Sequence, residues 1–225
     1  MSTAPVRRAK PRPRSVRSDG AQTRAQILQV AGRLFAEKGF ERTTSREICA
    51  EAGSNMAAVN YHFGGKNELY AAVLVEAHGQ LIKLDDLESI GKAGGNPQAQ
   101  LRALINLFVL RPQDAAKPWG LPVLLHEFMA PSDQVPALIR QAVLPKIRLM
   151  MSMVAAVLGL PADHPAVQRA LAFVVMPCIL LVIAPRDILR QALPQLASEP
   201  EVLAENLGRY ALAGLQAIGR RYRKA

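Results

Sequence analysis

Cysteine is nearly absent from this sequence of 225 residues: Cys49 and Cys178 stand alone and far apart. Two isolated cysteines provide neither a disulfide framework nor the ligand spacing of a zinc or redox site. We therefore expect a reducing, cytoplasmic setting, with no metal and no cofactor. Cys49 remains open to two interpretations, a redox switch or a small apolar packing residue.

Motifs of catalysis are also missing. The sequence has no His-Glu-x-x-His pattern, no nucleophile elbow and no phosphate-binding loop. His126 stands beside Glu127 without further partners in sequence, and His78 and His164 are equally isolated. No catalytic residue is predicted, so we do not expect an enzyme.

Long hydrophobic runs are few. The longest uncharged apolar stretch lies between Arg169 and Arg186 and contains Pro177 and Pro185. It is shorter than the roughly 20 residues that a membrane-spanning helix needs. No apolar signal core follows the basic N-terminus. The stretch predicts a buried helix, and no membrane partner is expected.

Acidic residues are absent from residues 1–18, which hold six Arg or Lys and three Pro. Such a segment cannot bury a core, so residues 1–20 are predicted to form a disordered basic arm. There are two interpretations of this arm. It is a solvated tail with no role, or it binds DNA through the phosphates or the minor groove. Residues 1–66 hold 12 Lys or Arg against 5 acids, out of a total net charge of +10. The N-terminal third is therefore the end that a polyanion such as DNA would meet.

Alternating strand patterns are lacking, and helical periodicity runs through the chain, so the fold is predicted to be all-α. An apolar stripe including Ile27, Ala31 and Leu34 predicts a first helix from Thr23 to Lys38, ended by Gly39. A longer helix is expected from Lys66 through Leu81. Later helices are predicted at 98–110, 119–130, 133–159, 163–184 and 199–223, with a break at 91–97. We expect a three-helix domain over 21–66 and a larger helical ligand-binding and dimerisation domain over 67–225.

Residues 44–63 have the pattern of a helix-turn-helix. Thr44 or Ser45 is an N-cap for a short helix. Gly53 permits the tight turn that follows, because glycine adopts positive φ without strain. Val59 on the second helix is then placed to pack on Ile48 of the first, which leaves the outer face of the second helix for a DNA major groove.

The stretch ILQVAGRLFAEKGFERTTSREICAEAGSNMAAVNYHFGGKNELYAAVL resembles the N-terminal domain of the TetR family of regulators. The matching elements include Gly39-Phe40, Arg46-Glu47-Ile48, Ala52-Gly53 and Tyr61-His62-Phe63, in order and at the family's spacing. The rest of the chain, with HEFMAPS at 126–132, resembles the subgroup that has a CecR-type C-terminal domain.

The resemblance implies a set of DNA contacts. Thr44, Tyr61, His62 and Lys66 would bind phosphates, and Asn60 would reach a base edge. Arg46 would reach either a base edge or a phosphate. Tyr61 has a second interpretation as a packing residue. The full set of predicted DNA-binding residues is Thr44, Ser45, Arg46, Asn55, Met56, Ala57, Ala58, Asn60, Tyr61, His62 and Lys66.

Two further sites are predicted in the C-terminal domain. An apolar ligand cavity is expected to be lined by Trp119, His126, Phe128, Met129, Met150 and Met153, and ordinary core packing is the alternative. The last two helices resemble the family's dimer interface, with an intramolecular core as the alternative. That interface would include Phe173, Met176, Leu180, Leu207, Ala211 and Leu215, and Gly208 and Gly214 would permit close helix approach.

The sequence thus predicts a homodimeric, sequence-specific transcriptional regulator that binds a palindromic operator in double-stranded DNA. The resemblance implies a repressor that a small apolar effector releases from DNA. Two rival functions are a DNA-compacting protein without sequence preference and a small-molecule-binding module that has lost its DNA function. Competition by unrelated DNA distinguishes a specific regulator from a DNA-compacting protein. A DNA-binding assay distinguishes it from a module that has lost its DNA function.

Overall fold

The computed structural model describes residues 16–110 and 119–223, and every regular element among them is helical. The chain divides into unit 1, Met1–Ala72, and unit 2, Val73–Ala225. The division falls inside the fourth helix, six residues later than the boundary expected after residue 66. Unit 1 contains α1 (Val16–Arg42), α2 (Ser45–Glu51), α3 (Met56–Phe63) and the first part of α4 (Lys66–Leu81).

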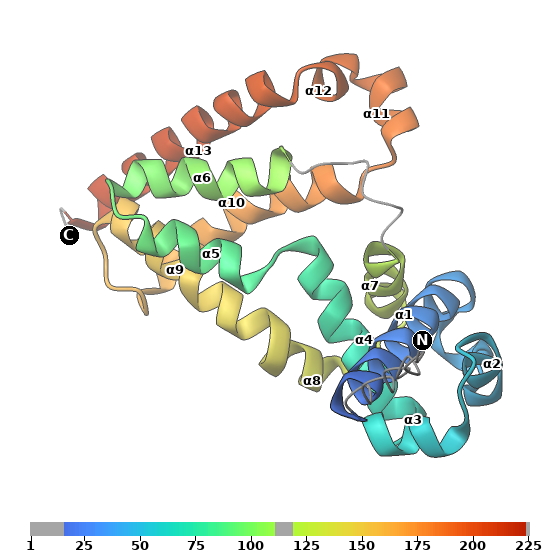
Figure 1. The fold of residues 1–225 in the computed structure, drawn as a ribbon. Coiled ribbons are helices and arrows are strands. Elements are labelled where there is room, and N and C mark those ends of the chain that lie inside the picture. The colour runs from blue at the N-terminus through green and yellow to red at the C-terminus, as the bar shows by residue number, and fades with distance from the viewer. Residues whose placement is uncertain (1–15, 111–118, 224–225) are drawn as a thin grey trace, which may run out of the picture. The chain divides into compact units, whose positions relative to one another are not determined.

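Unit 2 continues α4 and contains the remaining helices, which Figure 1 shows in green to red. They are α5 (Leu84–Lys92), α6 (Pro97–Val109), α7 (Gly120–Met129), α8 (Val135–Leu138), the π-helical turn η1 (Ile139–Val143), α9 (Leu144–Leu158), α10 (Pro165–Ile183), α11 (Arg186–Ala192), α12 (Pro194–Ser198) and α13 (Pro200–Arg223).

The first helix begins earlier than predicted. α1 starts at Val16, so residues 16–20 are helical rather than part of an arm, and residues 1–15 of the predicted arm lie outside the described residues. Asp19 stands in the first turn, where a carboxylate is favoured by the helix dipole. The hydroxyl of Thr23 donates to the carbonyl of Asp19 at 2.8 Å. The density of Arg and Pro before Asp19 concealed this start.

Gly39 interrupts α1 as predicted, with φ of 76° and ψ of 171°. The reversal returns Phe40 toward the helix it follows, and its ring lies 6.0 Å from Phe35 and 4.6 Å from Tyr70 between centroids. This aromatic group closes one end of a core that also contains Ile27 and Ile48, both fully buried. A left-handed glycine at this position is therefore what allows α1 to pack on the start of α4.

Unit 2 has one apolar core, to which α5, α6, α9, α10 and α13 contribute buried residues. The predicted helices correspond to α6, α7, α8 through α9, α10 and α13. Three helices were not predicted: α5, α11 and α12. α5 contains three acids among nine residues, yet Leu87 is fully buried and anchors it to the core. It extends into the predicted break, which shortens to residues 93–96.

Two segments, Val135–Leu158 and Pro165–Ile183, are long and apolar enough to cross a membrane by length and composition alone. Both supply buried residues to the core of unit 2, as core helices of water-soluble proteins do. The prediction of a buried helix is correct for only one face of α10. Its other face has exposed apolar side chains, described below.

Close helix approach occurs at Gly219 rather than at the glycines that were expected. A Cβ atom on Gly219 would stand 2.5 Å from the carbonyl oxygen of Leu158. At Gly208 the nearest atom would be Arg102 Cγ, at 3.7 Å, and at Gly214 nothing lies within 4 Å. Gly219 therefore allows α13 to contact the end of α9, whereas the role of Gly208 and Gly214 at a dimer interface stays a prediction.

A buried polar contact joins α4 to α9. Nζ of Lys146 lies 2.8 Å from Nδ1 of His78 and donates to the His78 carbonyl at 3.2 Å. Burial, together with the Lys146 ammonium, lowers the pKa of His78 to about 4. The imidazole is therefore neutral in the folded protein at neutral pH.

The pKa of His78 predicts that the fold weakens in acid. Between pH 6.5 and 4 the unfolded chain binds a proton at His78 that the folded chain does not, so stability falls as pH falls through this window. We expect the free energy of unfolding of the wild type to fall by about 2–3 kcal/mol more than that of His78→Gln between pH 7 and pH 4. Urea unfolding at both pH values measures this difference. Equal losses in the two proteins would contradict the assignment.

Candidate nucleic-acid interface

The first short helix of the helix-turn-helix is capped by Thr44. Its backbone is extended, and its hydroxyl oxygen accepts the amide of Glu47 at 3.2 Å. A hydroxyl that accepts can still donate, so the exposed Thr44 can serve as the cap and bind a phosphate oxygen at the same time. Ser45 beside it is half-buried and Arg46 is exposed. The first turn of α2 thus presents a hydroxyl and a guanidinium to solvent.

The turn between the helices forms as the sequence predicts. Gly53 adopts φ of 60°, in the left-handed region. The amide of Ser54 donates to the carbonyl of Cys49 at 2.9 Å. Asn55 then caps α3, because its Oδ1 accepts the amide of Ala58 at 2.9 Å. Oδ1 of Asn55 therefore accepts in the cap, and the side-chain amide nitrogen is left to donate to DNA.

The second helix, α3, separates an inner face from an outer one. Val59 is fully buried, as is Ile48 on α2. Met56 and Tyr61 are 45% and 85% exposed, and Ala57 and Asn60 are exposed as well. The exposure of Tyr61 disfavours its interpretation as a packing residue within the described chain. Ala58, His62 and Lys66 are half-buried at the edges of this face.

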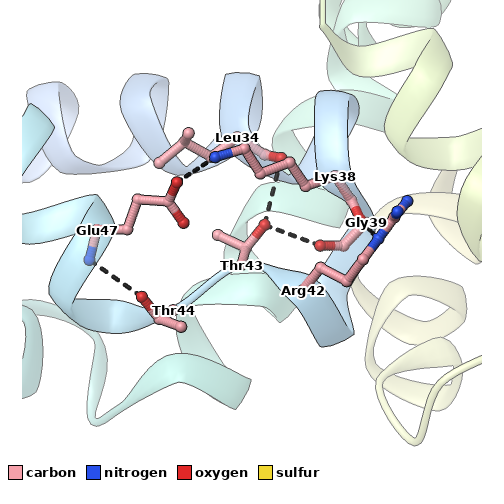
Figure 2. Close-up of polar contacts among 7 residues, drawn as sticks. All are labelled: Leu34, Lys38, Gly39, Arg42, Thr43, Thr44 and Glu47. Carbon is pink, nitrogen blue, oxygen red and sulfur yellow. Dashed lines mark hydrogen bonds and ion pairs between the residues drawn. The ribbon is translucent and has the colours of Figure 1, made fainter.

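A set of contacts between α1 and α2 holds the helix-turn-helix together (Figure 2). The buried hydroxyl of Thr43 lies 2.8 Å from the carbonyl of Gly39 and 3.3 Å from that of Leu34, both of which are acceptors for its single proton. Lys38 forms an ion pair with Glu47, and this hydrogen bond lowers the pKa of the Glu47 carboxyl and raises that of the Lys38 ammonium. These contacts orient α2, and with it the DNA-facing side chains, relative to α1.

The sequence alone did not assign Arg24 or Gly20 to this face. The guanidinium of Arg24 lies 4.8 Å from the ring centroid of Phe63, next to Tyr61 and His62 in sequence. The same part of α1 approaches His62, because a Cβ on Gly20 would stand 3.9 Å from its ring. Arg24 thus adds a cation at the C-terminal end of α3. Its position four and seven residues before Leu28 and Ala31, in line with the apolar stripe of α1, was the available signal.

Lys66 has a packing role as well as a charge. Its ammonium lies 4.2 Å from the ring centroid of Phe40, in a cation–π contact at the first residue of α4. The contact ties the end of the helix-turn-helix to the aromatic group of unit 1.

Cys49 is buried at the crossing of α2 and α3, and its Sγ lies 3.7 Å from Sδ of Met56. Burial raises the pKa of its thiol, so the thiol stays protonated at neutral pH and is a weak nucleophile. These observations favour the packing interpretation over a redox switch. Among the described residues, no group of three or more His, Cys, Asp or Glu is arranged to hold a metal ion.

The predicted ligand-pocket residues do not gather around one cavity. Trp119, Met150 and Met153 are buried, the last two in the apolar core, whereas Phe128 and Met129 are 81% and 80% exposed and His126 is exposed. Alternation of buried and exposed positions on a helix separates residues that are close in sequence. A groove of about 400 Å³ lies elsewhere, between α6 with its C-cap and α13, and is lined by Arg102, Asn106, Leu110, Glu201, Ala204, Glu205 and Arg209.

The predicted interface residues separate by helix. Phe173, Met176 and Leu180 of α10 are 64%, 58% and 61% exposed and form one stripe. On α13, by contrast, Ala211 and Leu215 are buried in the core of unit 2 and Leu207 packs against it. These positions favour the intramolecular alternative for Ala211 and Leu215, whereas Leu207 is only partly buried. The outward face of α13 instead presents Tyr210, which is 75% exposed.

Comparison with known proteins agrees with this geometry. Residues 27–73 match the family of bacterial regulatory proteins described as the tetR family. Residues 97–218, more than half of the chain, match the C-terminal domain of the HTH-type transcriptional dual regulator CecR.

Curated relatives match mainly in the N-terminal part. The HTH-type transcriptional regulator AcrR of Shigella flexneri is 32% identical over 92 residues, 41% of this chain and 42% of that protein. CecR of Shigella flexneri is 47% identical over 53 residues, 24% of this chain and 23% of that protein. The matches thus span less than half the length of these relatives.

Among solved structures, the fatty acid degradation regulator FadR of Bacillus halodurans has a TM-score of 0.62, at 16% identity over 84% of this chain and 98% of that one. SCO4454, a TetR-family transcriptional regulator from Streptomyces coelicolor, has a TM-score of 0.55, at 18% identity over 89% and 96% of the two chains. These likenesses show the fold, and confirm the all-α prediction.

Proposed function

This chain belongs to the TetR family of bacterial regulatory proteins, and from that membership we propose that it represses transcription by binding a specific palindromic operator in the cytoplasm. It is a DNA-binding transcriptional regulator and not an enzyme. What we propose beyond this is the sequence specificity, the repression, the homodimer and the release of DNA by a small-molecule effector.

The outer face of α3 is the observation that carries the proposal. Met56, Ala57, Asn60 and Tyr61 are all exposed on a short helix whose inner residue Val59 is fully buried. Small side chains allow the helix to enter the groove deeply, and methyl groups can contact thymine methyls. Asn60 is suited to pairing with adenine. Few hydrogen-bond donors face outward, so DNA shape is expected to contribute to the selectivity.

A binding assay tests specificity and the DNA contacts together. The DNA upstream of the protein's own gene is titrated at physiological salt with an excess of unrelated DNA. A specific regulator survives this competition, whereas a DNA-compacting protein does not. Arg46→Ala and His62→Ala should weaken binding by about tenfold or more, since each removes a contact of roughly 1–3 kcal/mol. Variants that bind as the wild type does would refute the contact assignment.

The homodimer is expected to form through the exposed stripe of α10. Two-fold symmetry would pair Phe173, Met176 and Leu180 with the partner and present two copies of α3 to half-sites about one or more DNA turns apart. Such an apolar stripe is uncommon on a monomer surface.

Placing a carboxylate in this stripe should dissociate the dimer. Phe173→Glu would bury an unpaired charge at the interface, so sedimentation at micromolar concentration should show a monomer. Met129→Glu, at a comparably exposed apolar position of α7, should remain a dimer. A wild type that sediments only as a monomer would exclude the dimeric arrangement.

A reporter assay decides whether the protein represses or activates transcription. CecR is described as a dual regulator, whereas the relative BepR of Brucella suis biovar 1 is described as a repressor. A reporter gene behind the bound promoter should become more active when the gene for this protein is deleted. Lower activity after deletion would show activation instead.

A further inference from the structure

Lys146 brings an ammonium group into the interior of unit 2. Its side chain is only 6% exposed, and its Nζ contacts Nδ1 and the carbonyl oxygen of His78 at 2.8 and 3.2 Å. An ammonium has only donors, so Nδ1 of His78 accepts and the ring proton lies on Nε2. The buried charge is therefore held between two neutral acceptors, one on the ring and one on the backbone of α4.

None of the ion pairs among residues 16–110 and 119–223 includes Lys146. A buried ammonium without an opposite charge is destabilised relative to one in water, because neutral acceptors replace only part of its hydration. Burial accordingly lowers the pKa of Lys146 to about 8. An acidic group brought beside this Nζ would compensate the buried charge.

The residues that follow along the same helix faces are apolar. Met150 and Met153 come four and seven positions after Lys146 on α9, so they lie on the same face of that helix. Ile82 follows the last residue of α4, and its amide donates to the His78 carbonyl at 3.2 Å. All three belong to the core of unit 2. Methionine side chains are unbranched and repack readily around a guest. The Lys146 ammonium thus lies next to an apolar region whose methionine side chains can repack.

We propose that Lys146, positioned by His78, binds the carboxylate of a small organic acid whose apolar part packs toward Met150 and Met153. That this acid is the regulatory effector rests on the proposed function, whereas the binding itself does not. Because His78 lies on α4, the helix that begins at Lys66 directly after the helix-turn-helix, a ligand at this contact acts on an element continuous in sequence with the DNA-binding residues.

Binding to the full chain without DNA tests the site, with octanoate and its neutral counterpart octanamide as probes at pH 7. Octanoate should raise the Tm of the wild type, and its Kd by calorimetry should be at least tenfold lower than that of octanamide. Lys146→Met should weaken octanoate binding at least tenfold and remain folded, since an apolar side chain replaces a buried charge. Lys146→Arg should retain binding, and Lys83→Met, at an exposed lysine, should bind like the wild type.

Equal affinity for octanoate and octanamide, unchanged octanoate binding by Lys146→Met, or no binding of millimolar octanoate by the wild type would each overturn the site. A separate DNA-binding assay tests the regulatory role: octanoate should weaken operator binding by the wild type and not by Lys146→Met. If octanoate binds through Lys146 but leaves DNA affinity unchanged, the effector role is wrong and the site stands. If the wild type binds no specific DNA, the proposed function fails independently.

Discussion

Gly219→Ala is expected to destabilise the protein by about 2–3 kcal/mol, although alanine is the better helix former by about 1 kcal/mol. The added Cβ would stand 2.5 Å from the carbonyl oxygen of Leu158 and 3.2 Å from its carbonyl carbon. Both are backbone atoms at the end of α9, which cannot rotate away as a side chain can. Relief requires α13 to move off the core, where Leu215 and Ala211 are buried.

Gly208→Ala is the matched control, because Gly208 lies on the same helix and is also buried. Its Cβ would meet only Arg102 Cγ, at an ordinary 3.7 Å. This variant should be neutral or more stable by up to about 1 kcal/mol. Trp119 is the only tryptophan and is buried in unit 2, so its fluorescence during urea unfolding follows this unit. Similar unfolding midpoints for the two variants would show that α9 and α13 do not approach closely at Gly219.

Ala57→Glu is expected to lower operator affinity at least a hundredfold, about 3 kcal/mol or more, at low salt. Ala57 is exposed on the outer face of α3, the face proposed to enter the major groove between two phosphate backbones. A carboxylate there faces the phosphates and has no partner in the groove other than cytosine amino groups. The fold should be retained, since an acid in the first turn of a helix is favoured by the helix dipole.

Two controls separate charge from shape and from position. Ala57→Gln has nearly the same size without the charge and should lose less affinity than Ala57→Glu. Ala99→Glu makes the same charge change in the first turn of α6, at an exposed position of unit 2, and should bind DNA like the wild type. Fluorescence anisotropy with labelled operator measures all three. Wild-type affinity in Ala57→Glu would mean that this face of α3 does not contact DNA.

Local signals of the helix-turn-helix were sufficient to predict its geometry. Thr44 and Asn55 are N-caps, Gly39 and Gly53 take positive φ, and Val59 is buried, because each depends on residues within a few positions along the chain. The start of α1 was missed for the opposite reason. Composition over residues 1–18 indicated disorder, although a favourable first turn at Asp19 was sufficient to extend the helix.

The C-terminal predictions show where sequence periodicity stops being informative. Helices α10 and α13 were located correctly, but the side of α13 that would face a partner was not. Ala211 and Leu215 pack inside the core, whereas Phe173 and Leu180 of α10 are exposed. An apolar residue has the same periodicity whether it faces its own core or a second protomer. Likewise, the periodicity of α7 did not distinguish Phe128 and Met129, which are exposed, from pocket-lining residues.

The sequence by itself determined that this chain is helical, that residues 44–63 form a helix-turn-helix, and that its basic end is suited to DNA. These properties follow from caps, turn glycines and charge, which act over a few residues. Only the tertiary structure decided that α13 approaches α9 closely at Gly219, that Arg24 lies beside α3 and that Lys146 meets His78 inside unit 2. Such pairs are far apart in sequence, and no local propensity encodes which helix faces pack together.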